Sequence, residues 1–177
     1  MRIIGVSGGP DAGGRTSTAI AGVLAGATGA ETALIELSET ALPDVIAAIE
    51  SADAVVFGSP IYRAGYSALL KDLLERTERG RWGEKTAPLQ GKVAATVLTG
   101  ASGHHFLATN DLRNVLAGFF AVQVLSPGLY FDPSGYEDRT TLNEASTALT
   151  AAHGAALADL ASAVRGSKAL GAITPQV

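Results

Sequence analysis

RIIGVSGGPDAGGRTST (residues 2–18) opens the chain with an apolar run that leads into a glycine-rich loop and then into an alanine-rich segment. The apolar run is typical of a buried strand, and Thr16, Ser17 and Thr18 are residue types that cap a helix. A strand, a glycine-rich loop and a helix in this order start a βα unit. The loop then lies at a helix N-terminus, where backbone N–H groups can hold an anion.

The same alternation of short apolar runs and longer helical patterns continues along the chain. We expect strands over residues 2–8, 32–38, 53–60, 92–100 and 121–128, and helices over residues 17–29, 43–52, 65–80, 105–120 and 141–165. Five strands that alternate with five helices predict an α/β domain whose parallel sheet is covered by helices on both faces. Residues 1–166 are expected to form this single domain, and residues 167–177 a loose C-terminal tail.

Composition excludes several classes of function. The chain of 177 residues has no cysteine, which excludes disulfides, thiolate catalysis and cysteine-ligated zinc. Its net charge of −4 argues against nucleic acid as a partner, because such proteins usually carry a basic face. No apolar run reaches the length of a membrane helix, and the start does not resemble a signal peptide. We therefore expect a cytoplasmic protein that does not enter a membrane.

The opening loop reads GPDAGGRT from Gly9, which is a nucleoside-triphosphate P-loop with Arg15 in place of lysine. Arginine does not replace that lysine easily, and the third strand ends in Gly58-Ser59-Pro60 without a carboxylate for magnesium. The glycine spacing does not match a dinucleotide fingerprint, and the acidic cluster of a receiver domain is absent. A cup for a single phosphate monoester and a plain capped turn both remain open.

Three loops follow predicted strands at the edge where ligands bind to parallel sheets, namely residues 7–18, 58–66 and 99–105. The second loop and the helix after it, GSPIYRAGYSALLKDLLER, form the most specific stretch in the chain. Tyr62 can present its ring to a flat ligand, Arg63 can supply charge, and Ser67 can cap the next helix. Packing within the protein is the alternative role for Tyr62.

Three motifs together resemble the NADPH-dependent FMN reductase family. They are GGPDAGGRTST after the first strand, GSPIYRAGYSALLKDLLE after the third, and LQGKVAATVLTGASGHH around the fourth. More narrowly, the chain looks like the reductase components of two-component sulfonate monooxygenases, from the N-terminus to about Phe131. The resemblance implies a flavodoxin-like fold, with a five-stranded parallel sheet of order 2-1-3-4-5 and one FMN-binding domain over residues 1–166.

The resemblance also implies which residues bind the cofactor. The first loop would hold the FMN phosphate, while the second and third loops would lie along the isoalloxazine ring. The residues expected to bind FMN are Gly9, Arg15, Thr16, Ser17, Pro60, Ile61, Tyr62, Arg63, Thr99, Gly100, Ala101 and Ser102. The family often has serine where this chain has Gly9 and Gly14, so fewer hydroxyl groups face the phosphate. No metal site is expected, because His104 and His105 lack a third ligand at a sensible spacing.

The implied activity is that of an NAD(P)H:flavin oxidoreductase, in which hydride passes from NADPH to N5 of the flavin. The cofactors carry this chemistry, so no catalytic side chain is required. Reduced flavin would then serve a partner monooxygenase or another acceptor. A homodimer or homotetramer is expected, with helix 65–80 and the loop around Trp82 as candidate interfaces. The alternatives are a flavodoxin-type electron carrier, a quinone or azo-compound reductase with tightly bound FMN, and a flavin-free α/β binding domain.

Overall fold

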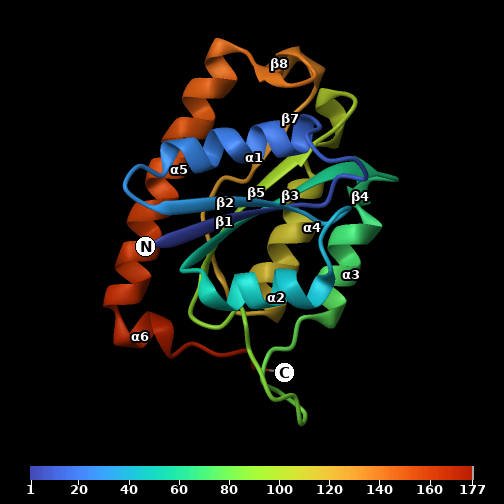
Figure 1. The fold of residues 1–177 in the computed structure, drawn as a ribbon. Coiled ribbons are helices and arrows are strands. Elements are labelled where there is room, and N and C mark those ends of the chain that lie inside the picture. The colour runs from blue at the N-terminus through green and yellow to red at the C-terminus, as the bar shows by residue number, and fades with distance from the viewer. Residues whose placement is uncertain (177) are drawn as a thin grey trace.

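Helices lie on both faces of a central, mostly parallel sheet in the computed structural model, which describes residues 1–176 (Figure 1). The strands are β1 (Arg2–Ser7), β2 (Glu31–Glu36), β3 (Ala54–Tyr62), β4 (Gly65–Tyr66), β5 (Val93–Thr99), β6 (Gln123–Val124), β7 (Leu129–Phe131), β8 (Tyr136–Asp138) and β9 (Thr141–Leu142). The helices are α1 (Arg15–Gly26), α2 (Leu42–Ser51), α3 (Ala68–Arg76), α4 (Ala108–Asn114), α5 (Glu144–Gly166) and α6 (Lys168–Gly171). Short 3₁₀ turns, η1 (Gly103–His105) and η3 (Pro133–Gly135), and a π-helical turn, η2 (Val115–Phe119), complete the set. Within residues 1–176, no helix is long and apolar enough to span a membrane.

The sheet has the order β2-β1-β3-β5-β6, and all of these neighbours are parallel. The expected α/β flavodoxin-like class is therefore confirmed. The path through these five strands follows the expected order 2-1-3-4-5, but the sheet has seven strands rather than five, because β4 and β7 also pair with it. The fifth strand was expected over 121–128, but it consists of two pieces, β6 and β7, that both pair with β5. Pro127 lies between the pieces and has no N–H to donate to β5, so the chain leaves the sheet there. Two antiparallel hairpins, β3–β4 and β8–β9, were not predicted.

Each face of the sheet has its own apolar core. Helices α1 and α5 cover one face, where Ile20 and Leu157 pack with Val56 of β3. Helices α2, α3 and α4 cover the other face, where Leu73 and Leu112 pack with strand residues such as Phe57. Burial of one such side chain contributes about 1.5–3 kcal/mol. Both faces of the strands are apolar because both are covered, as the continuous hydrophobic runs predict.

Helix boundaries depend on local capping. Helix α1 begins at Arg15, earlier than expected, because Gly14 takes the extended N-cap conformation. The side chain of Ser67 accepts a hydrogen bond from Leu70 N at the start of α3, as predicted. The helix expected over 105–120 is divided into η1, α4 and η2. In η2, Phe120 N donates to Val115 O at 3.2 Å, the i to i+5 bond of a π-helix.

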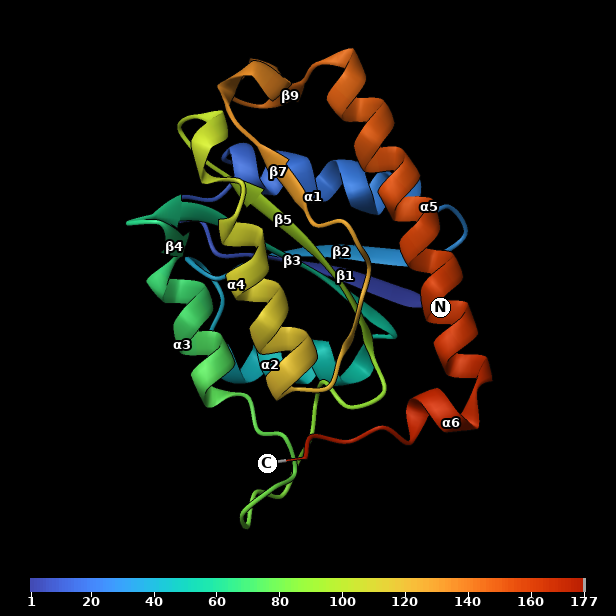
Figure 2. The same ribbon diagram turned by 180° about the vertical axis from the view of Figure 1, so that it is seen from behind.

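The C-terminal segment expected to be a loose tail contains α6 and returns to the body of the protein. The Arg81 guanidinium donates to Thr174 Oγ1 at 3.1 Å and to the Pro175 carbonyl oxygen. Both views show this segment meeting the long loop that follows α3 (Figure 2). The loop carries Trp82, which is 86% exposed, so local packing does not account for this tryptophan.

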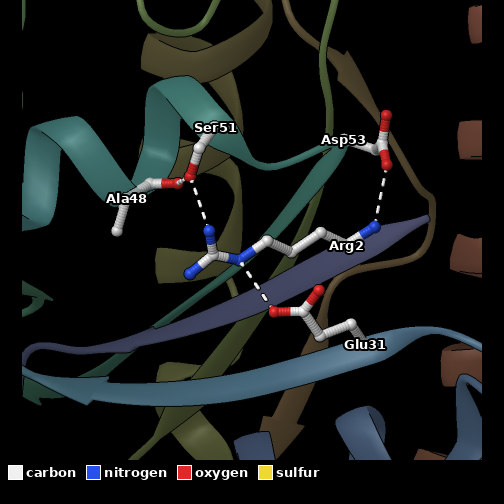
Figure 3. A network of polar contacts seen from close by, with 5 residues as sticks. All are labelled: Arg2, Glu31, Ala48, Ser51 and Asp53. Carbon is white, nitrogen blue, oxygen red and sulfur yellow. Dashed lines mark hydrogen bonds and ion pairs between the residues drawn. The ribbon is translucent and has the colours of Figure 1, made fainter.

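A polar network joins the starts of the central strands at the amino edge of the sheet (Figure 3). Arg2 N donates to Asp53 Oδ2 at 2.8 Å, and its guanidinium donates to Ser51 Oγ at 2.9 Å and lies 3.7 Å from Glu31 Oε1. These contacts hold β1 against β2, α2 and the start of β3. The opposite, carboxyl edge is where the loops are open to solvent.

Helices α1 and α5 approach so closely that glycine is required at their contact. A Cβ atom added to Gly154 would overlap Val23 O and lie 2.8 Å from Ala27 N, both backbone atoms of α1 or its cap. A Cβ atom on Gly26 would likewise lie 2.6 Å from Ala151 Cα. The small residues therefore set the distance between the two helices.

We expect Gly154→Ala to lower the free energy of unfolding by about 1–3 kcal/mol, because the rigid backbone of α1 cannot yield. Gly166→Ala in the same helix is the matched control, since no atom lies within 4 Å of its added Cβ. The control should be neutral or stabilising by a few tenths to about 1 kcal/mol. Urea unfolding followed by circular dichroism measures both variants. A Gly154→Ala protein as stable as the wild type would contradict the close packing.

Candidate functional site

A cavity of about 400 Å³ opens at the carboxyl edge of the sheet, between the loops that follow β1, β3 and β5. Its volume falls within the range of small-molecule sites. The cavity is lined by Gly9, Pro10, Asp11, Gly14, Arg15, Thr16, Pro60, Ile61, Tyr62, Thr99, Gly100, Ala101 and Arg139. All three loops selected from the sequence therefore meet at one place.

The N-terminus of α1 forms one end of the cavity. Its N-cap is Gly14, which has no side chain to cap the helix, and its first turn contains no acidic residue. The first N–H groups of a helix have no partner within it and carry a partial positive charge. Gly13, at φ 68°, takes a backbone conformation that favours glycine, and its N–H donates to Glu36 Oε1 at 3.1 Å. The loop thus leaves the first turn of α1 open to an anion.

Two buried hydroxyl pairs fix this helix start. Thr16 Oγ1 lies 2.7 Å from Thr99 Oγ1, which joins α1 to the end of β5. Ser17 Oγ lies 3.0 Å from Ser7 Oγ, which joins α1 to the end of β1. Ser17 is only 3% exposed and does not line the cavity, although it was expected to contact phosphate. Its hydroxyl instead forms the buried hydrogen bond with Ser7 that holds α1 against the end of β1.

Arg15 is held by an aromatic ring from a distant segment. The Tyr136 hydroxyl donates to Arg15 O at 2.9 Å, and the Arg15 guanidinium lies over the Tyr136 ring at 5.6 Å from its centroid. Burial raises the pKa of the Tyr136 phenol well above its usual range, with Arg15 acting in the opposite direction. The phenol therefore stays protonated and keeps donating. Arg15 also lines the cavity.

The second loop is a continuation of β3 rather than a simple turn. Pro60 and Ile61 remain part of β3, and the chain reverses through Arg63 and Ala64 into β4. Both turn residues have positive φ, 51° and 67°, as in a type I′ hairpin turn. Tyr62 lines the cavity and is 53% exposed, so its ring is free to meet a ligand.

Arg63 was expected to lie along the ring of the flavin, but the structure places it at the exposed tip of the β3–β4 hairpin, outside the cavity wall. The cause is the hairpin itself, which turns the chain away from the sheet after Tyr62. In Figures 1 and 2 this hairpin projects beyond the carboxyl edge.

The third loop presents backbone rather than side chains. Gly100 N donates to Phe131 O at 2.9 Å, and the Tyr130 hydroxyl donates to the carbonyl oxygen of Ser102. Ser102 therefore serves as an anchor and does not line the cavity, in contrast to Thr99, Gly100 and Ala101. Burial raises the pKa of the Tyr130 phenol, which keeps this donor protonated.

The two adjacent histidines belong to η1 and are exposed. Within residues 1–176, no three His, Asp or Glu side chains are grouped so as to hold a metal ion.

The sequence reasoning missed four residues of the cavity wall: Pro10, Asp11, Gly14 and Arg139. Pro10, Asp11 and Gly14 lie inside the first loop, so the glycine-rich pattern that located the loop also covers them. Arg139 comes from the turn between β8 and β9, and no motif in that part of the sequence connects it with the opening loop.

The strand order, together with a cavity at the carboxyl edge of the sheet, places the protein in the flavodoxin-like class. Within this class, the chain belongs to the family described as NADPH-dependent FMN reductase, whose model matches residues 1–136. The same motifs indicated this family from the sequence, and the resemblance is thereby confirmed.

Two curated relatives are named as FMN reductases. The chain is 32% identical over 90 residues to NADH-dependent FMN reductase SfnF of Pseudomonas putida, which covers 51% of this chain and 45% of that protein. It is 35% identical over 88 residues to FMN reductase (NADPH) of Escherichia coli strain K12, covering 49% of this chain and 41% of that protein. Each match thus spans less than half of the relative.

Among solved structures, the fold is similar to that of an NADH:FMN oxidoreductase in its apo form. The TM-score is 0.76 at 21% identity, and the match covers 90% of this chain and 89% of the other. At this identity the likeness supports the shared fold alone.

Substitution of Gly100 by alanine tests how closely the third loop packs against Tyr130. The added Cβ would overlap Tyr130 Oη and lie 3.0 Å from Tyr130 Cζ. We expect Gly100→Ala to destabilise the protein by about 1–3 kcal/mol through this collision, and Tyr130→Phe by about 1 kcal/mol through the lost hydrogen bond.

Removal of the hydroxyl relieves most of the collision, so the double variant should lose less stability than the sum of the single variants. Urea unfolding of the four proteins completes the cycle. Strict additivity would show that Gly100 and Tyr130 do not meet as described.

Proposed function

We propose that the protein is an NAD(P)H-dependent FMN reductase. One observation carries this proposal: a single cavity joins the N-terminus of a helix that has no side-chain cap to a wall formed by Pro60, Ile61 and Tyr62 of β3. FMN has the matching chemistry, with a phosphate monoester at one end and a planar ring at the other. Membership of the FMN reductase family supports the same assignment.

The residues present fit FMN. The first-turn N–H groups of α1 and the Arg15 guanidinium would bind the phosphate. Pro60, Ile61 and Tyr62 would lie along the ring on one side, with the backbone of Gly100 and Ala101 on the other. We assign no flavin contact to Ser17, Arg63 or Ser102, because none of them lines the cavity. When bound, FMN supplies the redox chemistry, since its N5 accepts the hydride that a nicotinamide donates.

The protein's own contribution is binding and orientation. Thr16 and Thr99, through their buried hydroxyl pair, keep the phosphate end and the ring end of the cavity at a fixed separation. The exposed ring of Tyr62 borders the open side, where the nicotinamide would stack. No proton donor is required of the chain, and the cavity wall contains no histidine.

The preferred nicotinamide cofactor is a further part of the proposal. NADPH was expected, yet one relative is named as NADH-dependent and another as an NADPH enzyme. An exposed arginine beside the cavity would favour NADPH, because a guanidinium pairs well with the 2′-phosphate. Arg63, which is exposed at the tip of the β3–β4 hairpin next to Tyr62, would be the candidate for this contact.

A partner monooxygenase as the user of reduced flavin belongs to the same proposal. The second candidate function is an electron carrier of flavodoxin type, which the shared fold permits. Carriers are often strongly acidic, because charge helps them to dock to redox partners. A net charge of −4 over 177 residues is mild and favours the reductase.

Titration of the purified, flavin-stripped protein with FMN tests the proposal, followed by oxidation of NADPH and NADH with and without excess free FMN. We expect saturable FMN binding and turnover that depends on free FMN. Turnover that requires a quinone and tightly held FMN would instead select an acceptor reductase. Stable bound flavin with slow NADPH oxidation would select the carrier, and failure to bind flavin would refute all three.

Self-association is a separate part of the proposal, for which Trp82 is the best probe. Its loop is well ordered: the Glu78 carboxylate accepts hydrogen bonds from Thr86 Oγ1, Thr86 N and Lys85 N. These bonds, chiefly that from the Thr86 side chain, lower the pKa of Glu78. An exposed tryptophan in an ordered loop is typical of an interface.

Light scattering after size exclusion should show a dimer or tetramer for the wild type and a smaller species for Trp82→Ala. Leu149→Ala, which removes another exposed apolar side chain, serves as the control. An unchanged assembly in Trp82→Ala would exclude this loop from the interface.

A further inference from the structure

Asp11 and Arg139 face each other at the cavity, although they are far apart in the sequence. Asp11 belongs to the first loop, and Arg139 lies in the turn between β8 and β9. Arg139 Nη2 is 3.6 Å from Asp11 Oδ2, and the side chains are 67% and 76% exposed. An exposed ion pair of this length is weak. A competing anion can therefore open it.

Arg139 also lies beside the start of α1. A Cβ atom added to the N-cap residue Gly14 would be 3.9 Å from Arg139 Nη2. The guanidinium is thus within reach of an anion bound at the first turn of the helix. Arg15 is on the same wall, so two arginines border the phosphate end of the cavity.

The hairpin presents Arg139 from an ordered turn. The Asp138 carboxylate accepts hydrogen bonds from Thr140 N at 2.7 Å and Thr140 Oγ1 at 3.0 Å, and these close the turn around Arg139. Tyr136, at the start of β8, donates to Arg15 O and ties the hairpin to α1. The position of Arg139 is therefore coupled to the helix that would hold the phosphate.

We propose that Arg139 binds the phosphate of FMN and that Asp11 competes with this phosphate for Arg139. The inference rests on the proposed function, because the phosphate is that of the flavin. On binding, the Asp11–Arg139 pair is exchanged for an Arg139–phosphate pair, while the Asp11 carboxylate repels the phosphate from close by. Arg139 selects phosphorylated flavin over riboflavin, and Asp11 weakens its retention, so that FMN exchanges readily as a substrate.

Dissociation constants for FMN and riboflavin, measured by flavin fluorescence and calorimetry, test both roles. We expect Arg139→Gln to raise the dissociation constant for FMN by about tenfold or more, which is the effect of losing one charge-assisted hydrogen bond. The dissociation constant for riboflavin, which has no phosphate, should change by less than about twofold. The dissociation constant of Arg139→Lys for FMN should lie between those of the wild type and Arg139→Gln, because lysine keeps the charge but lacks the planar guanidinium.

Asp11→Asn should tighten FMN binding several-fold and leave riboflavin binding unchanged. The substitution removes both the repulsion between Asp11 and the phosphate and the competition of Asp11 for Arg139. Arg165→Gln is the matched control. It breaks an exposed ion pair of similar length, 3.7 Å to Asp53, at the opposite edge of the sheet, and should change neither constant. Raised ionic strength should reduce the preference of the wild type for FMN over riboflavin.

Two results would overturn the inference and leave the reductase assignment intact. One is an unchanged ratio of FMN to riboflavin affinity in Arg139→Gln, and the other is weaker FMN binding in Asp11→Asn. A wild-type protein that binds neither flavin would refute the proposed function itself. Circular dichroism of each variant, all at exposed side chains, checks that the fold is retained.

Discussion

The hydrogen bond between the buried hydroxyls of Thr16 and Thr99 is the contact on which the site depends. It joins the first turn of α1 to the last residue of β5, and its atoms are 2.7 Å apart. Because both residues are almost fully buried, loss of either hydroxyl would leave its partner unsatisfied. The two sides of the cavity, at the N-terminus of α1 and at the end of β5, are therefore parts of one rigid frame, even though Thr16 and Thr99 are 83 positions apart in the chain.

The two edges of the sheet and the helix layers are held by different kinds of contact. The amino edge of the sheet is closed by the network around Arg2, and the helix layers are set by glycine contacts such as Gly154. The carboxyl edge is left open, with its loops anchored through backbone and hydroxyl groups. The Ser17 hydroxyl and the Ser102 carbonyl oxygen, which belong to two residues expected to contact the flavin, act as these anchors. These polar groups are used within the protein, so neighbouring residues such as Thr16 and Gly100 line the cavity instead.

The sequence was sufficient for the architecture because hydrophobic pattern and local capping decide it. Continuous apolar runs predicted strands buried on both faces, and the motifs after β1, β3 and β5 located the cavity. The position of Arg63 outside the cavity wall could not be predicted, because the β3–β4 hairpin depends on two non-glycine residues with positive φ, which no simple turn rule predicts. Arg139 was missed because its place depends on the long-range contact of Tyr136 with Arg15, and such contacts leave no local pattern.

The β8–β9 hairpin has a consequence for how this protein can diversify. The family pattern ends at Tyr136, and the turn that reaches into the cavity comes immediately afterwards. Its tip is exposed and contributes nothing to either apolar core, so substitutions there leave the stability of the fold nearly unchanged. Substitution of a few tip residues can therefore change the part of the cavity wall that Arg139 forms, while the sheet and its helices stay constant. Proteins with the same scaffold can in this way come to differ in the shape and charge of the cavity while they keep the same fold.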